Sequence, residues 1–344
     1  MLGKLKRIPQ QMKNRLAPGG LILLYHRVTG ARPDPWECCV TPQHFAEQLE
    51  VLRKHFRPVP LEQMINVVTS EQPSFFSRRP IAVTFDDGYA DNLHAARPLL
   101  ERYEVPATVF VTSGNIERTQ EFWSDEMERL LLQPGTLPSH LQLRINGEDQ
   151  QWNLGEATSY SASSFHRHQQ WNATGEADPT PRHQLYRDLY PLLQPMAEGP
   201  REQLFDELRR WSGHQPVRRE THRFLTLAEL HSLAASELIE IGGHAVTHPM
   251  LSTLATEAQR DEIRQGKLWL EETLQRPLKS FAYPYGDYTL ETATITREVG
   301  FERAVITRRG IVNPQSDVFQ LPRVQVKDWS GKEFSAWLSH WLFD

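Results

Sequence analysis

The segment 84–88, Thr-Phe-Asp-Asp-Gly, places two adjacent carboxylates directly after an apolar run at residues 81–85. The ends of parallel strands are where α/β barrels display catalytic groups. Neighbouring side chains leave the backbone in different directions, so Asp86 and Asp87 can perform different tasks. An isolated Asp-Asp-Gly is also a common turn, so its interpretation depends on what other residues join it.

Two histidines supply such a partner, because the segment 244–249, His-Ala-Val-Thr-His-Pro, also follows an apolar run. Two imidazoles four residues apart can converge on one ion. Together with one aspartate they form a set that leaves coordination positions open for water and substrate, which is typical of catalytic rather than structural sites. We therefore expect His244, His248 and one of the two aspartates to bind one divalent ion, Zn²⁺ in first place, with Co²⁺, Ni²⁺ or Mn²⁺ as alternatives.

A third segment, 281–286, Phe-Ala-Tyr-Pro-Tyr-Gly, ends another apolar run with a rigid proline and a permissive glycine. This combination suits a loop that directs backbone N–H groups at a ligand. Alone it is a weak signal.

The elements that must position these residues follow a repeating order. Apolar runs that can form buried strands occur at residues 21–25, 81–85, 107–111, 238–242, 279–283, 303–307 and 320–326. Helical patterns lie between most of them, for example after the candidate N-cap Thr41 and the capping box at residues 226–229. This alternation predicts an α/β fold with a parallel sheet, and 344 residues suit one barrel of roughly 250 residues with an insertion.

Residues 117–222 interrupt that order and are interpreted as the insertion. They combine a helical pattern, a predicted hairpin around Asn146-Gly147 and a polar stretch at residues 156–183. A solvent-exposed lid or spacer is the first interpretation. The alternative is a substrate-gripping role, in which Trp123, Trp152 and Trp171 would stack on a sugar.

Composition restricts the partners and the compartment. The net charge of -5 argues against nucleic acid, because phosphate binding normally requires a basic surplus. The two cysteines, Cys38 and Cys39, are adjacent and form no disulfide framework, which favours a reducing compartment. Residues 1–20 form a basic leader without a signal-peptide pattern, and they could rest on an anionic membrane surface. We expect a cytoplasmic protein, with the inner face of the membrane as an alternative, and no particular oligomeric state.

The order of TFDDG, HxxxHP and YPYG along the chain resembles the polysaccharide deacetylases of carbohydrate esterase family 4, the NodB-homology fold. The resemblance covers residues 21–115 and 226–326. It implies a distorted (β/α) barrel with about seven parallel strands, divided into residues 21–116 and 223–344 by a mixed helical and hairpin insertion, residues 117–222, that could be a lid.

The resemblance also implies roles for individual residues. Asp86 matches the catalytic base, and Asp87, His244 and His248 match the metal ligands. Tyr285 matches the residue whose backbone N–H stabilises the oxyanion, within a substrate-binding loop formed by Tyr283, Pro284 and Tyr285.

Two departures from the family pattern lead to further expectations. The arginine that steadies the catalytic aspartate in many members is replaced by Ala282, and we expect Arg323, in Leu-Pro-Arg, to take its place. The late histidine motif that supplies a general acid is not evident. His26, which ends the first strand, is the expected substitute, because the chain resembles the rearranged poly-N-acetylglucosamine deacetylases there.

The sequence thus predicts hydrolysis of an N-acyl group, N-acetyl in first place, from an amino sugar in a bacterial surface polysaccharide, glycolipid or precursor. Two alternatives stay open. One is a deformylase of a lipid-linked amino sugar, and the other is a catalytically silent carbohydrate-binding protein.

Overall fold

The computed structural model describes residues 19–70, 78–175 and 177–343. The expected basic leader, residues 1–20, and its possible membrane contact therefore lie outside the described residues, apart from the last two positions. Among the described helices, none is both long and apolar enough to cross a membrane.

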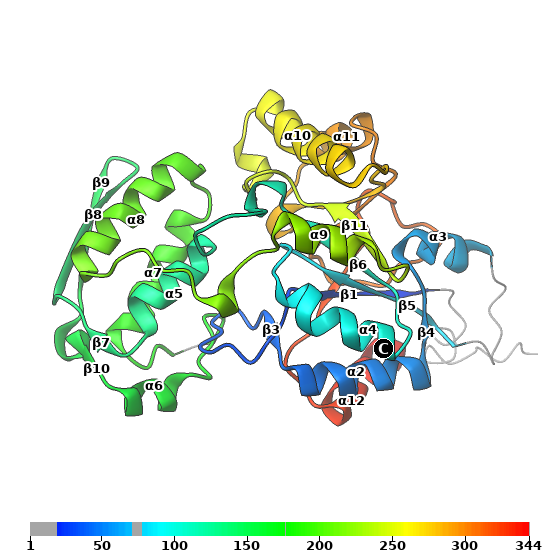
Figure 1. Ribbon diagram of the computed structural model, residues 1–344. Helices are drawn as coiled ribbons and strands as arrows, with labels where there is room; N and C mark the ends of the chain where they lie inside the picture. The colour runs from blue at the N-terminus through cyan, green and yellow to red at the C-terminus, as the bar shows by residue number, and fades with distance from the viewer. Residues whose placement is uncertain (1–18, 71–77, 176, 344) are drawn as a thin grey trace, which may run out of the picture.

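A curved parallel sheet forms the centre of the molecule (Figure 1). Across the sheet the strands lie in the order β13 (Arg303–Val305), β12 (Ser280–Ala282), β11 (Ile239–Gly243), β6 (Ala107–Val111), β5 (Pro80–Phe85), β1 (Leu21–Tyr25) and β14 (Val324–Gln325). A short strand, β4 (Arg57–Pro58), also pairs with β5. All these pairs are parallel. The path of seven parallel strands confirms the predicted fold class.

The two ends of this path are connected by the segment that leads into β14. The Ala304 N–H donates to Val318 O at 2.8 Å, and the Ile306 N–H donates to Leu321 O at 2.9 Å. Because Leu321 lies three residues before β14, the sheet curls round into a distorted barrel.

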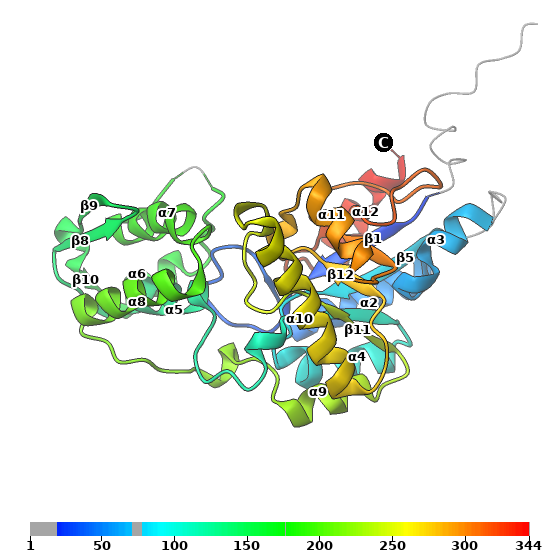
Figure 2. The ribbon, with the colours of Figure 1, turned by 90° about the horizontal axis from the view of Figure 1, so that it is seen from above.

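Helices cover the outside of the sheet. They are α2 (Pro42–His55), α3 (Leu61–Ser70), α4 (Arg97–Arg102), α9 (Leu227–Ala234), α10 (Thr256–Leu274), α11 (Leu290–Glu298) and α12 (Gly331–Phe343). In Figures 1 and 2, α10 and α11 lie together on one side of the sheet, and α2 and α12 lie on the other. Thr41 caps α2, and Thr226 and Glu229 form the predicted capping box of α9.

Short elements complete the barrel half of the chain. They are the parallel pair β2 (Arg27–Val28) and β3 (Cys39–Val40), a π-helical turn at Asn92–Ala96 before α4, and 3₁₀ turns at Ser113–Asn115, Glu220–His222, Leu251–Thr253 and Pro284–Gly286.

Side chains from alternate strand positions fill the inside of the barrel. Ile22, Ala82, Phe110, Ala282 and Val305 come from five strands and form one buried cluster. Their neighbours, such as Leu23 and Val83, belong to a separate cluster under the helices. Side chains alternate between the two faces of a strand. A residue that follows one of these inward-facing residues by two or four positions along the same strand therefore also faces inward.

This alternation places three of the predicted site residues on the inner face, at the end of the barrel where the strands finish. His26 lies four residues after Ile22, and Asp86 lies four residues after Ala82. His244 lies two residues after Gly242, whose close approach to the Phe110 ring would leave a Cβ only 2.5 Å from that ring. The fold thus directs these three side chains toward the same open end of the barrel, which we call its mouth.

The segment 123–212, within the predicted insertion, forms a lobe beside the barrel, drawn in green in Figure 1. Its elements are α5 (Trp123–Leu132), β7 (Gly135–Thr136), β8 (His140–Ile145), β9 (Glu148–Asn153), a 3₁₀ turn at Gly155–Thr158, β10 (Ser159–Tyr160), α6 (Ala162–His168), α7 (Pro181–Leu193) and α8 (Glu198–Ser212). Asn146 and Gly147 join β8 to β9 with φ angles of 53° and 85°, as a two-residue hairpin requires. The lobe contains most of a hydrophobic cluster separate from the barrel clusters.

A buried arginine holds this lobe together. The Arg182 side chain, 1% exposed, donates hydrogen bonds to five backbone carbonyls, including Ala157 O at 2.6 Å, Thr158 O at 2.7 Å and Gly135 O at 2.8 Å. The Arg182 guanidinium therefore links the β7–β10 pair to the end of α5 by donating to carbonyls of both.

We predict that Arg182→Met lowers the free energy of unfolding by about 3 kcal/mol, because it leaves several buried carbonyls without donors. Urea unfolding followed by tryptophan fluorescence measures this loss. Arg167→Met is the control, since Arg167 is exposed on α6, and it should change stability by less than about 0.5 kcal/mol. Equal stability of the two variants would contradict a structural role for Arg182.

Candidate active site

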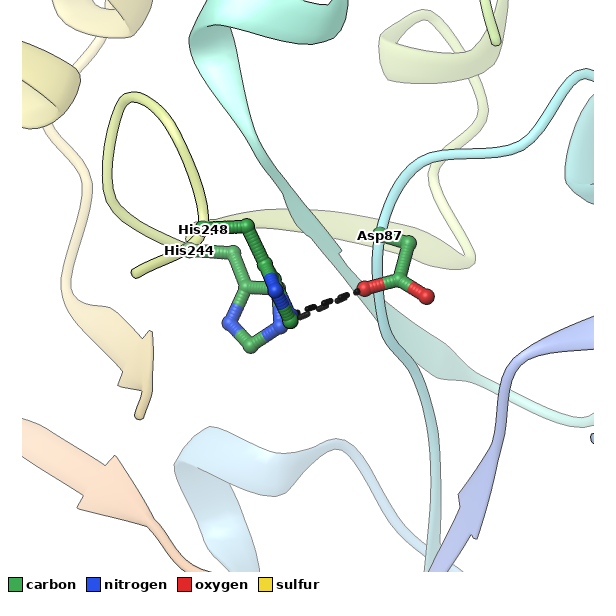
Figure 3. A group of neighbouring side chains, drawn as sticks. All are labelled: Asp87, His244 and His248. Carbon is green, nitrogen blue, oxygen red and sulfur yellow. Dashed lines mark ion pairs between the residues drawn. The ribbon is translucent and has the colours of Figure 1, made fainter. Parts of the chain in front are cut away.

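Asp87, His244 and His248 gather at the mouth of the barrel, as Figure 3 shows. The Nε2 atoms of His244 and His248 lie 3.5 and 3.3 Å from the same oxygen, Oδ1 of Asp87. One ligand atom from each residue lies within 4.8 Å of the other two. Three donors in this space can bind a single ion.

Left-handed backbone conformations orient two of these side chains. Asp87 has a φ of 77° and His248 a φ of 58°, and Ala245 between the histidines has a φ of 62°. Such conformations are costly for residues other than glycine, and they persist where the surroundings hold them in place, often at active sites.

The carboxylate of Glu262, on α10, holds the histidine loop. It accepts hydrogen bonds from the N–H groups of Val246 and Thr247, each at 2.9 Å, and from the Thr247 hydroxyl at 2.8 Å. From the opposite side the Gly114 N–H donates to Val246 O at 2.9 Å, and a Cβ on Gly114 would lie 2.5 Å from that oxygen. The loop is therefore fixed from two directions.

The chemistry of this donor set fits a metal ion. Nδ1 of His244 lies 2.7 Å from the carbonyl of Ala282, and a donor at Nδ1 leaves Nε2 free to coordinate. Burial lowers the pKa of His248 and so favours its neutral form. Burial raises the pKa of Asp87, but hydrogen bonds from both histidines outweigh it and hold that pKa well below its usual value. Burial also lowers the pKa of His244, but the carboxylates of Asp86 and Asp87 outweigh it and raise that pKa. A charged carboxylate and neutral imidazoles are the forms that bind metals, so binding of an ion would release the proton of His244.

Beside the ligand cluster, Asp86 forms a two-pronged ion pair with Arg323. Both guanidinium NH₂ groups donate to the carboxylate at 2.7 Å, and both side chains are almost fully buried. Arg323 also donates to Thr84 Oγ1 at 3.2 Å and to Ile306 O at 3.3 Å, which fixes its position. Burial raises the pKa of Asp86, but the charge of Arg323, followed by that of His244, brings that pKa below its usual value.

His26 faces the same cavity as the metal ligands and Asp86. Its Nδ1 is buried and has no hydrogen-bond partner among the described residues. Its backbone is held where β1 ends, because the Asn92 side-chain amide donates to His26 O at 2.9 Å.

The loop predicted to bind substrate divides into two parts. The Tyr285 ring lines the cavity and lies edge-on to His248 with centroids 4.4 Å apart, and its backbone has a φ of 59°. Tyr283 instead points into the core, where its hydroxyl donates to Phe319 O at 3.1 Å, and neither Tyr283 nor Pro284 lines the cavity. Among the predicted substrate-binding side chains, only Tyr285 is thus brought to the site.

The cavity above these residues, of about 120 Å³, also has walls that the sequence motifs did not identify. The segment 33–39 and the insertion contribute side chains, among them Trp36, Asp125, Glu128 and Tyr190. These residues follow no strand end and share no spacing with the motifs, so no pattern in the sequence marks them. The three insertion tryptophans proposed to stack on a sugar do not line the cavity.

Comparisons with known proteins identify the family of this chain. The family model described as polysaccharide deacetylase matches residues 76–170 and 216–304, slightly more than half of the chain. YxkH of Bacillus subtilis (strain 168), which is named as a polysaccharide deacetylase, is 24% identical over 153 residues, or 42% of this chain. That match spans 52% of YxkH, so the aligned region is about half of that relative's length.

Solved structures of the same fold match nearly the whole chain. The deacetylase PplD of Streptococcus pyogenes, solved in complex with acetate, has a TM-score of 0.56 and 17% identity, covering 95% of this chain and 98% of its own. IcaB from Ammonifex degensii has a TM-score of 0.56 and 18% identity, covering 93% and 97%. At these identities the structures support the fold, and the family model supports the assignment: this chain belongs to the polysaccharide deacetylase family.

Proposed function

We propose that this chain hydrolyses an N-acyl group, N-acetyl in first place, from an amino sugar of a bacterial surface polysaccharide, glycolipid or precursor, with the help of one divalent metal ion. The observation that carries the proposal is the position of Asp86. A carboxylate held by Arg323 lies with one oxygen 4.0 Å from Nε2 of the proposed ligand His244. A proton acceptor beside an ion-binding set is the arrangement that metal-assisted hydrolysis of an amide requires.

Asp87, His244 and His248 would hold the ion, and Zn²⁺ suits two imidazoles and one carboxylate. A bound ion of this kind would lower the pKa of its water to about 7 and would polarise the substrate carbonyl.

The chain's own residues would divide the remaining work. Asp86 would accept the proton of the attacking water, with Arg323 holding its carboxylate in one orientation. The Tyr285 N–H would donate to the carbonyl oxygen as negative charge develops there. His26 would donate a proton to the departing nitrogen, because expelling a neutral amine is much easier than expelling an anionic one.

The two neighbouring aspartates should fail in different ways when changed. Asp86→Asn should keep its metal and lose about 10² to 10⁴ in turnover, because it removes the proton acceptor. Asp87→Asn should bind the ion at least about tenfold more weakly, because it removes a ligand. Competition with a chelator measures the affinity, and release of acetate measures the activity. Full activity in Asp86→Asn would overturn the assignment of the base.

Arg323 should set the acidic limb of the pH profile. The pKa of Asp86 is depressed, so the base is ionised above that pKa and activity falls as the pH drops through it. Arg323→Lys keeps the charge but loses the paired geometry, and Arg323→Ala loses both. The limb should therefore move to higher pH, further in the alanine variant.

The profile of kcat/KM against pH tests this, with Arg303→Lys as the control. Arg303 lies on β13 and pairs with Glu302 at 3.0 Å, away from the cavity. An unchanged profile in Arg323→Ala would leave Arg323 with a structural role only.

His26→Ala should discriminate between substrates by their leaving groups. Turnover of an N-acetyl amide should fall by about 10² or more, whereas an ester with a good leaving group, such as 4-nitrophenyl acetate, should lose less than about tenfold. His94→Ala is the control, because His94 is exposed and pairs with Glu229 outside the cavity. Equal losses on both substrates would assign His26 to structure.

A further inference from the structure

One part of the cavity wall combines aromatic rings with a carboxylate. Trp36 comes from the loop before β3, and Tyr190 comes from α7 of the insertion. Their ring centroids lie 4.1 Å apart, and both residues are partly exposed. The Trp36 indole donates to the Tyr186 hydroxyl at 3.0 Å, which fixes its plane.

This aromatic wall continues to the metal ligands. Tyr190 packs against Trp123 with centroids 4.8 Å apart, and the Trp123 indole donates to the Tyr285 hydroxyl at 3.1 Å. Tyr285 in turn contacts His248. A ligand lying on Trp36 and Tyr190 would therefore extend toward the ion.

Asp125, on α5, supplies the polar part of the wall. The Tyr89 hydroxyl donates to its Oδ2 at 2.8 Å, and Tyr89 lies only two residues after Asp87. Its other oxygen has no hydrogen-bond partner among the described residues, whereas Glu128, one turn further along α5, uses both oxygens to accept from Arg219 and Gln133. Within the described part of the chain, Asp125 thus has one oxygen without a partner to offer a ligand, whereas both oxygens of Glu128 already accept a hydrogen bond.

The charges around the cavity restrict that ligand further. Five carboxylates line it, from Asp34, Asp86, Asp87, Asp125 and Glu128. The single lysine or arginine among its described lining residues is Arg27, which already binds Asp91 at 3.1 Å and the carbonyl of Thr221, and lies over the Tyr89 ring. No spare cation lines the described cavity to receive a phosphate or a carboxylate.

We propose that Asp125, Trp36 and Tyr190 form the subsite for the sugar ring that carries the acyl group, and that this ring bears no phosphate or carboxylate. The inference rests on the proposed function and specifies its substrate class. Aromatic faces pack against the C–H faces of a sugar ring, and a carboxylate accepts hydrogen bonds from its hydroxyls. A neutral sugar unit satisfies all three residues.

Binding can be measured apart from turnover in the Asp86→Asn background. The probes are N-acetylglucosamine, its β-linked dimer and trimer, and, as the anionic comparison, UDP-N-acetylglucosamine. Asp125→Asn and Trp36→Leu should each weaken binding of the neutral probes by about tenfold or more, since each loses a charged hydrogen-bond acceptor or a stacking face. Titration calorimetry measures the affinities.

Two controls keep the residue types matched. Asp188→Asn and Trp171→Leu change the same residue types within the insertion, but neither residue lines the cavity, so affinities should stay within about twofold. Unfolding curves establish that all variants are folded. In the active protein, Asp125→Asn should raise KM at least tenfold, with a much smaller change in kcat.

The outcomes separate this proposal from the proposed function. One outcome would overturn the subsite alone: the unchanged protein releases acetate, but Asp125→Asn and Trp36→Leu bind the neutral probes with unchanged affinity. Binding that depends on them, without release of any acyl group, would overturn the function and support the subsite. Absence of binding by every neutral probe, or tighter binding of the nucleotide sugar, would contradict the inference directly.

Discussion

The alternation of side chains along parallel strands is the constraint on which the site depends. Ile22, Ala82 and Gly242 face the inside of the barrel, so His26, Asp86 and His244 must face the same way where the strands end. The next residue after an inward position would normally face outward. The left-handed backbone at Asp87 changes its direction, and its carboxylate joins the histidines instead. Because of the left-handed backbone at Asp87, the two adjacent aspartates have different partners: Asp86 pairs with Arg323, and Asp87 lies beside the two histidines.

Those partners account for the electrostatics of the mouth. Two carboxylates buried side by side are costly unless each is compensated. Arg323 compensates Asp86 with a paired set of hydrogen bonds. The imidazoles of His244 and His248 lie beside the Asp87 carboxylate, and the three residues could hold an ion together. The same division supports the proposed mechanism, because a residue held by an arginine can move a proton while its neighbour keeps a constant charge. The arginine comes from the residue just before β14 and not from Ala282, the usual position, whose carbonyl instead accepts from His244.

Much of the fold could be predicted from the sequence, because apolar strand runs and the spacing of motifs depend on local structure. The seven strands, the capping box at Thr226 and the hairpin at Asn146-Gly147 were predicted, and the structure confirms them. The roles of His26, Arg323 and Tyr285 remain predictions, although the structure brings all three to the mouth. The part of the cavity wall that Trp36, Asp125 and Tyr190 form was not predicted. These residues come together only through tertiary packing between the barrel and the insertion. Substrate binding by Tyr283 also remains a prediction, and its side chain lies in the core and not on the cavity wall.

Metal titration coupled to product analysis tests the central claim most directly. Protein freed of metal is incubated with an N-acetylated amino sugar or oligosaccharide while Zn²⁺ is added in steps, and acetate and formate are both measured. The account predicts no release without metal, and acetate release that rises to a plateau at one ion per chain, with one amine formed per acetate. Release that persists in metal-free protein, or no acyl product from any such sugar at full metal occupancy, would contradict it.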